Sequence, residues 1–414
     1  MIRRTARKTL VKQAYFPRYL PISKTSGYLL YVQGVGGTAF GNTIGGGTIF
    51  ARQMDAERLE LTGPAVPVLQ DVAGRSVYGL SQFALTPSGN LVYLASGDTP
   101  ELSLFWLDAA GNLQRLPASP ARYLNLSPSP DGKRVALFIS SLGTNLRVYD
   151  WASDRMTQLT FQSGPLDETG GRAAYPAWTP DGQHLVFAVN GQDLEGPGMY
   201  WVRADGAAAV RRLFEGKRLS AYSFSPDGKY LAYTDWSHGY EIRTVFLDLS
   251  NPEVPKMGTP ELFFSSNLTV FVPNFSPDGR WIAYSSWESR PPQLSVRPFH
   301  ASGPTAGAHW QVSTNVIGGS SFWSPRRELF YQAVDMRIYV APYSVQGDAF
   351  VPGTPRLWSE KAPPIRGGSP YLSMMPDGKR FIVALPAAAA EPQKQLTVLL
   401  NFGDWLRQQV PGAK

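Results

Sequence analysis

The sequence predicts an all-β chain folded as a β-propeller with four-stranded antiparallel blades. The first observation is a repeated phrase, FSPDGKYLAYTD at 224–235 and FSPDGRWIAYSS at 275–286. The second is that versions of this phrase recur about every 48 residues, the length of one propeller blade. The third is the composition of 40 Gly, 35 Pro and 12% aromatic residues, which favours many short strands and turns.

The proline of each repeat marks its place in the chain. The markers are Pro21, Pro87, Pro130, Pro180, Pro226, Pro277, Pro325 and Pro376. Because they run from end to end, they predict a single domain over 1–414 with eight blades. The alternative is seven blades, with the degenerate first repeat outside the ring.

The best-preserved repeats carry Pro-Asp-Gly between two apolar runs, which predicts a tight turn joining the first and second strands of a blade. Proline presets φ, aspartate tolerates the next position, and glycine takes the position that needs positive φ. We expect this structural role for Pro130, Asp131, Gly132, Pro180, Asp181, Gly182, Pro226, Asp227, Gly228, Pro277, Asp278, Gly279, Pro376, Asp377 and Gly378.

A third and a weaker fourth strand follow each turn, as in EIRTVFLDL (241–249) and AVRRLFEG (209–216). The strands do not alternate cleanly between polar and apolar residues, so both faces of each small sheet are expected to be buried. The last repeat supplies three strands, at 370–375, 379–386 and 395–402, and then a possible helical turn at 402–410. We therefore expect residues 5–12 to pair antiparallel beside 396–401 and to close the last blade.

Charge and cysteine content exclude several classes of function. The net charge is +7, and Arg3, Arg4, Arg7, Lys8 and Lys12 supply most of it, so the rest is nearly neutral and no nucleic-acid partner is expected. The chain has no cysteine, which removes disulfides and thiol catalysis. No apolar run is long enough to span a membrane, and the basic N-terminus lacks the apolar segment of a signal peptide. The compartment is not assigned.

The F-S-P-D-G-[KR]-x-[IL]-A-[YF] phrase resembles the repeat of TolB-like propellers. Further segments, at 59–72, 310–315, 326–333, 376–386 and 396–406, resemble the C-terminal propeller of bacterial transmembrane serine/threonine protein kinases. That resemblance implies an extracytoplasmic sensor or interaction region. The kinase motifs H-R-D, D-F-G and V-A-I-K are missing from this sequence, so the resemblance implies the sensor part alone.

Catalytic and cofactor motifs are not found. The glycine-rich stretch GVGGTAFG (34–41) lacks the strand-then-helix context and the Lys-Ser/Thr of a phosphate-binding loop. A G-x-S-x-G nucleophile elbow is missing, and the four histidines lack the spacing of a zinc site. His184 occupies a strand position held elsewhere by Arg134, Tyr230 or Trp281. We therefore predict no catalytic residue, no metal and no cofactor.

Ligand binding is expected on the rim opposite the Pro-Asp-Gly turns, where the loops between blades and between second and third strands vary most. Exposed aromatic and arginine side chains on such loops are common in recognition. The candidates are Arg18, Arg122, Tyr175, Tyr222, Asn274, Trp236, His238, Trp287, Glu288 and Arg290. The alternative is that these residues fill the axial channel.

The sequence thus favours a monomeric, non-catalytic propeller that binds a protein, peptide or cell-envelope ligand. Two alternatives stay open. One is a propeller enzyme, of lyase or glycoside hydrolase type, that uses the axial pocket. The other is an architectural domain or gene fragment with no independent role.

Overall fold

The structure is a computed structural model. It describes residues 9–11, 14–34, 45–75, 80–86, 88–95, 101–140, 144–161, 174–190, 194–288, 292–301, 308–313, 315–363, 365, 371–386 and 396–410. Strands dominate, and α1 (Phe402–Gln409) is the one helix among the described elements. The all-β class and the helical segment after residue 401 are as predicted.

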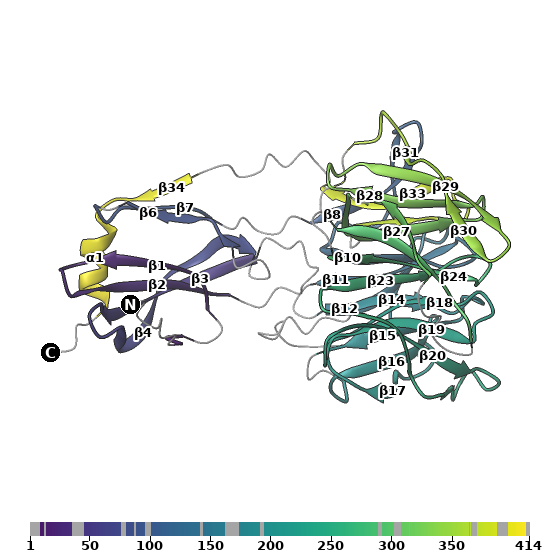
Figure 1. The fold of residues 1–414 in the computed structure, drawn as a ribbon, viewed down its shortest axis with the longest axis horizontal. Helices are drawn as coiled ribbons and strands as arrows, with labels where there is room; N and C mark the ends of the chain where they lie inside the picture. The colour runs from purple at the N-terminus through teal and green to yellow at the C-terminus, as the bar shows by residue number, and fades with distance from the viewer. Residues whose placement is uncertain are drawn as a thin grey trace. The chain divides into compact units, whose positions relative to one another are not determined.

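The chain divides into two compact units, whereas we expected one domain (Figure 1). Unit 1 comprises Met1–Pro100, Asp167–Gly170 and Ala389–Lys414, and unit 2 comprises Glu101–Leu166 and Gly171–Ala388. Both ends of the chain therefore contribute to unit 1, and the middle of the chain builds unit 2.

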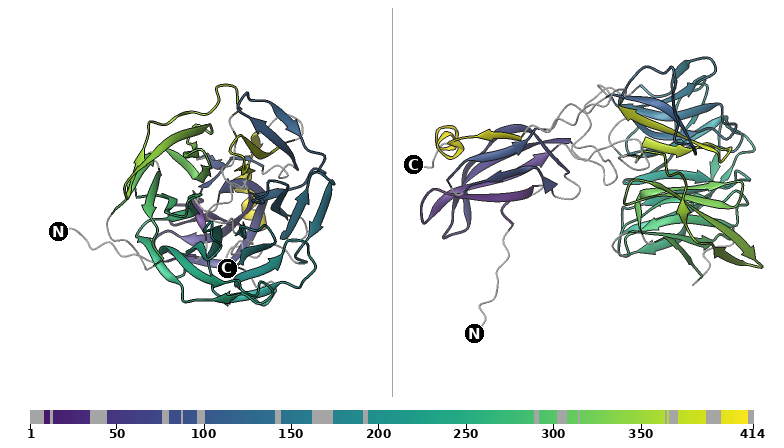
Figure 2. Two further views of the ribbon diagram at one scale, coloured as in Figure 1. Left: turned by 90° about the vertical axis from the view of Figure 1, so that its right-hand side faces the viewer. Right: turned by 90° about the horizontal axis from the view of Figure 1, so that it is seen from above.

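Unit 2 is a β-propeller of six blades, and its ring is visible in the left view of Figure 2. Blade 1 contains β10 (Tyr123–Pro128), β11 (Arg134–Ser140), β12 (Thr144–Asp150) and β13 (Arg155–Gln158). Blade 2 contains β14 (Ala174–Trp178), β15 (His184–Val189), β16 (Gly198–Arg203) and β17 (Arg211–Glu215). Blade 3 contains β18 (Leu219–Phe224), β19 (Tyr230–Asp235), β20 (Tyr240–Asp248), β21 (Lys256–Met257) and β22 (Glu261–Ser266).

The remaining blades complete the ring. Blade 4 contains β23 (Val270–Phe275), β24 (Trp281–Ser286), β25 (Gln293–Pro298) and β26 (Trp310–Ser313). Blade 5 contains β27 (Val316–Ser324), β28 (Glu328–Ala333), β29 (Ile338–Gln346), β30 (Ala349–Pro352) and β31 (Arg356–Leu357). Blade 6 contains β32 (Leu372–Met374) and β33 (Arg380–Pro386), joined by β8 (Leu102–Asp108) and β9 (Leu113–Arg115).

The six blades correct the expectation of eight or seven. The markers from Pro130 to Pro376 each belong to one blade, but Pro21 ends a strand of unit 1. Residue 87 lies outside the described residues, between two paired strands of unit 1. A hairpin turn is common to many β folds, so counting turns overestimated the number of blades.

Ring closure also differs from the prediction. The strand at 102–108 was expected to follow the hairpin before it, but it pairs with β33, from Arg380↔Asp108 to Pro386↔Leu102. Residues 9–11 form no strand, and the rest of 5–12 lies outside the described residues. The expected partner of 5–12, β34 (Leu396–Leu399), pairs instead with β7 (Leu91–Leu94). The last blade is closed by β8 and β9, so the prediction that residues 5–12 close it is wrong.

Each junction between neighbouring blades holds its own hydrophobic cluster. Leu104 and Trp106 of blade 6 pack with Tyr123 and Val135 of blade 1, so the closing junction is packed like the others. Corresponding clusters join blades 1 and 2, 2 and 3, 3 and 4, 4 and 5, and 5 and 6. Because both faces of every sheet are covered, the strands carry apolar residues at consecutive positions, as in the fully buried β15.

Unit 1 contains two sheets and α1. The larger sheet has β1 (Tyr15–Pro21), β2 (Ser26–Gly34), β3 (Gly45–Asp55), β4 (Glu60–Arg75) and β5 (Leu80–Ser81). The smaller has β34, β7 and β6 (Phe83–Leu85), in that order. The core combines Leu30 and Ile49 with Phe402 and Leu406 of α1. Chain segments more than 350 residues apart in sequence therefore share one core.

Two of the boundaries between the units, near residues 100 and 389, are flanked by strand residues that pair with each other within each unit. Leu102 and Pro386, where the chain enters and leaves unit 2, are partners in β8 and β33. Leu94 and Leu396, the corresponding residues of unit 1, are partners in β7 and β34.

Candidate interaction surface of the propeller

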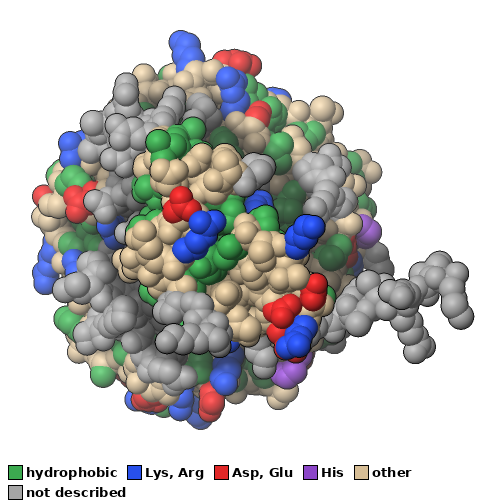
Figure 3. Space-filling view, turned by 90° about the vertical axis from the view of Figure 1, so that its left-hand side faces the viewer, with side chains coloured by type: hydrophobic (Ala, Val, Ile, Leu, Met, Phe, Trp, Pro, Cys, Tyr) green, Lys and Arg blue, Asp and Glu red, His purple; other side chains and the backbone are tan. Residues whose placement is uncertain are grey.

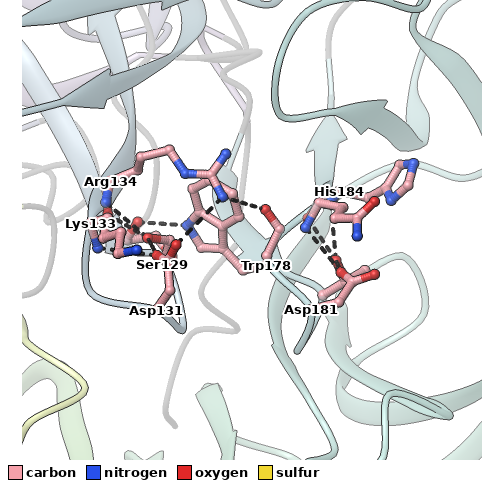
Figure 4. Close-up of polar contacts among 11 residues, drawn as sticks. Ser129, Asp131, Lys133, Arg134, Trp178, Asp181 and His184 are labelled. Atoms are coloured by element: carbon pink, nitrogen blue, oxygen red, sulfur yellow. Dashed lines mark hydrogen bonds and ion pairs between the residues drawn. The ribbon is translucent and has the colours of Figure 1, made fainter. Parts of the chain in front are cut away.

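The turns between first and second strands use their polar side chains internally (Figure 4). Ser129 Oγ donates to Asp131 Oδ1 at 2.5 Å, and the same carboxylate oxygen accepts the Lys133 N–H at 3.1 Å. Ser129 Oγ in turn accepts the Arg134 N–H at 2.9 Å. Burial acts to raise the pKa of Asp131, but these hydrogen bonds outweigh it and hold the pKa below its usual value.

The same arrangement recurs in three further blades, with Thr179–Asp181, Ser225–Asp227 and Ser276–Asp278 each at 2.5 Å. These carboxylates are therefore engaged in their own turns. Among the described residues no group of three His, Asp or Glu side chains is placed to hold a metal ion.

The turns also contact one another around the ring. A side chain added at Gly182 would lie 3.7 Å from Pro130 Cδ, and one at Gly228 would lie 3.5 Å from Pro180 Cδ. The contact that closes the circle is between Gly132 and Pro376, at 3.9 Å. The glycine of one turn thus faces the proline of the preceding turn, so the face with the Pro-Asp-Gly turns is a packed structural surface.

A tryptophan bridge supports the first of these contacts (Figure 4). Trp178 Nε1 of blade 2 donates to Ser127 O of blade 1 at 2.8 Å. The Arg134 guanidinium lies 5.1 Å from the Trp178 ring centroid and donates to Gly182 O at 2.7 Å. One arginine and one indole therefore connect two blades.

On the opposite rim, the loops between second and third strands bond to the connections between blades. Trp236 N–H donates to Arg218 O at 3.2 Å, and Trp287 N–H donates to Thr269 O at 2.9 Å. In blade 5 the Val334 N–H donates to Asn315 O at 2.9 Å. These two kinds of loop thus form one rim.

Several residues expected to be exposed on this rim are instead used to join blades. Trp236 is buried, and its Nε1 donates to Val270 O of blade 4 at 3.2 Å. Asn274 donates through Nδ2 to Ser321 O at 2.8 Å, and its carbonyl accepts the Trp323 Nε1–H at 2.9 Å. Both are interblade bridges, and sequence reasoning missed this because residue type alone does not reveal which backbone group an indole or amide contacts.

Tyr175 and Tyr222 form a ring pair between blades 2 and 3, with centroids 4.8 Å apart. Burial raises the pKa of Tyr222. Tyr175 adopts φ 32° at a bulge of β14, and Asn125 and Val272 adopt φ 53° at the matching bulges of blades 1 and 4. The inner strands are therefore bent at one level around the axis, and the tyrosine pair packs there.

The remaining candidates separate into three groups. Arg122 and His238 are exposed, Glu288 is exposed and accepts a bond from Ser266 Oγ at 3.2 Å, and Trp287 is half-buried. Arg18 is exposed but lies on β1 of unit 1, with its guanidinium 3.9 Å from the Phe16 ring centroid. It therefore belongs to unit 1 and is not part of the propeller. Arg290 lies outside the described residues.

A concavity that was not foreseen from the sequence lies between blade 2 and the 249–255 loop of blade 3. It has a volume of about 420 Å³ and is lined by Glu195, Trp201, Arg203, Ala208, Ala209, Val210, Arg211, Glu253 and Val254. Most of its charges are paired, because Arg203 contacts Asp205 at 2.6 Å and Glu253 at 2.9 Å. Trp201 Nε1 donates to Pro252 O at 3.0 Å and ties the loop to blade 2.

Behind this hollow, His184 is a strand side chain, as its repeat position predicts. It is buried and stacks on Trp201 with ring centroids 4.6 Å apart. Burial lowers the pKa of His184, although the carboxylates of Asp181 and Glu253 act to raise it. The imidazole is therefore held in its neutral form.

Charge is not concentrated on the face drawn in Figure 3, where basic and acidic side chains are interspersed among the residues that the structure describes. Within those residues, no helix is long and apolar enough to cross a membrane.

Comparison with known proteins identifies no family. No protein-family profile matches the chain, and no curated protein matches it. Among solved structures, the chain is similar to a protein described as TolB from Agrobacterium tumefaciens, at 17% identity and a TM-score of 0.49. That match covers 69% of this chain and 98% of the other.

Two further structures have lower scores. TolB from Acinetobacter baumannii is 16% identical, with a TM-score of 0.39 over 86% of this chain and 79% of the other. A puromycin-hydrolysing peptidase from Mycobacterium tuberculosis is 14% identical, with a TM-score of 0.38 over 82% of this chain and 46% of the other. The propeller assignment rests on the blades, strand pairing and ring closure of unit 2.

Proposed function

We propose that unit 2 is a non-catalytic interaction propeller that binds a protein, peptide or cell-envelope ligand on the rim opposite the Pro-Asp-Gly turns. The observation that carries this proposal is that the rim holds two kinds of side chain, buried ones that join blades and exposed ones that are free to contact a ligand. Trp236 and Asn274 bond to the backbone of the next blade, while Arg122, His238 and Glu288 are exposed on the loops of this rim. Varied exposed side chains on loops fixed by a rigid scaffold suit recognition.

The ligand class follows from the chemistry of these side chains. A guanidinium, an imidazole and a carboxylate, with a half-buried indole at Trp287, can pair with the mixed charges and backbone groups of a protein surface. The finer proposal, that this propeller is the sensor part of a serine/threonine kinase system, is supported only by the resemblance of segments such as 376–386 and 396–406.

Affinity capture with two matched variants tests the proposal. The rim variant changes Arg122, His238 and Glu288 to Ala, and the control changes Lys133, Lys229 and Lys379, all exposed on the opposite face, to Ala. A partner enriched by wild type and the control, but lost with the rim variant, is then purified and its Kd measured. We expect at least a tenfold weaker Kd for the rim variant, and equal losses with both variants would contradict the proposal.

A further inference from the structure

The edge of the smaller sheet of unit 1 is apolar and unpaired among the described residues. β34 pairs with β7 on one side, from Leu396↔Leu94 to Leu399↔Leu91, and no described strand lies on its other side. Leu396 is 68% exposed and Val398 51% exposed, and Leu400, which directly follows the strand, is 72% exposed. Alternate residues along this edge thus present apolar side chains to solvent.

This edge strand lacks the charged residues and prolines that prevent an exposed strand from pairing with another chain. Residues 395–403, QLTVLLNFG, contain neither a charged residue nor a proline. By contrast, the outer strand β17 of blade 2 carries Arg211, Arg212 and Glu215. Charges and prolines on edge strands prevent pairing with another chain, so β34 is open to strand addition.

We infer that β34 pairs antiparallel with β34 of a second copy of this chain, around a twofold axis at Val398. Opposite residues of an antiparallel pair point to the same face of the sheet. An axis at Val398 therefore places Val398 opposite its counterpart and Leu396 opposite Leu400 of the other copy. An axis at Thr397 would pair Leu396 with Val398 but leave Leu400 opposite Lys394. The sequence of this edge is thus complementary to itself in one register.

The size of the interface sets its strength. A single pair of short strands buries less than the roughly 1,200 Å² typical of stable interfaces, so association is weak and depends on concentration. The two smaller sheets become one continuous sheet across the axis, and the three pairs of apolar side chains contact one another and lose part of their exposure to water. This inference is independent of the ligand proposed for the propeller.

Cysteine cross-linking tests the register, since the chain has no cysteine of its own. Val398→Cys should cross-link with itself through a short bifunctional thiol reagent, because opposite side chains lie about 5 Å apart. Leu396→Cys alone should not, because four residues along a strand separate the two thiols by about 13 Å. A mixture of Leu396→Cys and Leu400→Cys should cross-link. Self-linking of Leu396→Cys as efficient as that of Val398→Cys would overturn the register.

Sedimentation equilibrium over a concentration series tests the association itself. Wild type should show a weak dimer, and Val398→Lys should weaken it at least tenfold. Leu268→Lys, at a residue of unit 2 that is 48% exposed, should leave it unchanged. Leu400→Lys serves as a second variant should Val398→Lys alter the circular dichroism spectrum. A wild type that stays monomeric at every concentration, or a dimer that both edge variants leave intact, would overturn the inference.

Discussion

The two units hold themselves together in different ways. In unit 2 every hydrophobic cluster lies between blades that are neighbours in the ring, and the same turn recurs from blade to blade. In unit 1 one core joins strands near the N-terminus to α1 near the C-terminus. Unit 2 is therefore stabilised by similar junctions between neighbouring blades, whereas the core of unit 1 needs segments from both ends of the chain.

The largest expected effect is on α1. Leu406→Asp places a carboxylate in the core of unit 1, where Leu406 is fully buried, and should cost about 3 to 5 kcal/mol or more. Unit 1 should then lose its protection from hydrogen exchange while the strands of unit 2 keep theirs. Trp405→Asp, at a residue 39% exposed, is the neighbouring control and should have little effect. Equal loss of protection in both units would show that they fold as one.

Trp236→Ala should destabilise unit 2 by about 3 to 5 kcal/mol, because it removes a buried indole and its bond to blade 4. His238→Ala, two residues further along the same loop and exposed, should leave the melting temperature within a degree or two. Thermal unfolding of both variants measures the difference, and similar melting temperatures would exclude the bridging role.

Gly378 and Gly347 provide a matched pair within unit 2. Both have positive φ, at 65° and 59°, so valine costs about 1–3 kcal/mol of strain at either. A side chain at Gly378 would also meet Ser324 Oγ at 2.7 Å, whereas Gly347 has open space. Gly378→Val should therefore be the more destabilising by about 1–3 kcal/mol in urea unfolding. Equal costs would mean that the contacts between turns contribute nothing to the ring.

The smallest effect depends on pH and tests one blade junction. Burial lowers the pKa of His184 below its ordinary value of 6.5, so the unfolded chain binds the proton more readily than the folded one. The free energy of unfolding of unit 2 should be highest above pH 6.5. It should fall as the pH drops through the pKa of His184 in the folded chain. The groups that face this imidazole are Asp181, Glu253, Asp205 and Arg203.

His184→Phe keeps a ring against Trp201 and removes the titration, so its stability should be flatter between pH 7 and 5. Melting temperatures across this range measure the slope, with His238→Phe as an exposed control. The turn aspartates, whose pKa values are lowered at Asp131 and Asp227, lose their contribution at more acidic pH and do not obscure the effect. A wild type and His184→Phe with the same slope would contradict the prediction.

The blades could be predicted because the residues that form their turns are recognisable in the sequence. Pro-Asp-Gly with flanking aromatic and branched residues specifies a hairpin locally, and its spacing specifies the blade. The division into two units could not be predicted, because β8 and β33 lie more than 270 residues apart and neither sequence indicates which strand it pairs with. Pairing between distant strands is decided by the packing of the whole fold.

The rim was predicted in part. Its location follows from strand order, and Arg122, His238 and Glu288 are exposed there. The inward direction of Trp236 and Asn274 could not be read from residue type, because the same side chain serves recognition when exposed and bridging when buried. The hollow beside Trp201 forms where the 249–255 loop of blade 3 packs against blade 2, and the spacing of residues in the sequence does not reveal this contact.

Unit 2 begins and ends within one blade, because Leu102 and Pro386 are partners in β8 and β33. The residues that flank it in unit 1, Leu94 and Leu396, are partners as well, so the propeller is an insertion between β7 and β34. Partners in an antiparallel ladder have Cα atoms about 5 Å apart, so both the inserted propeller and its host unit have closely spaced ends at the junction. Closely spaced ends are what domain insertion and excision require, so residues 101–388 are compatible with folding by themselves as an unaltered six-bladed ring.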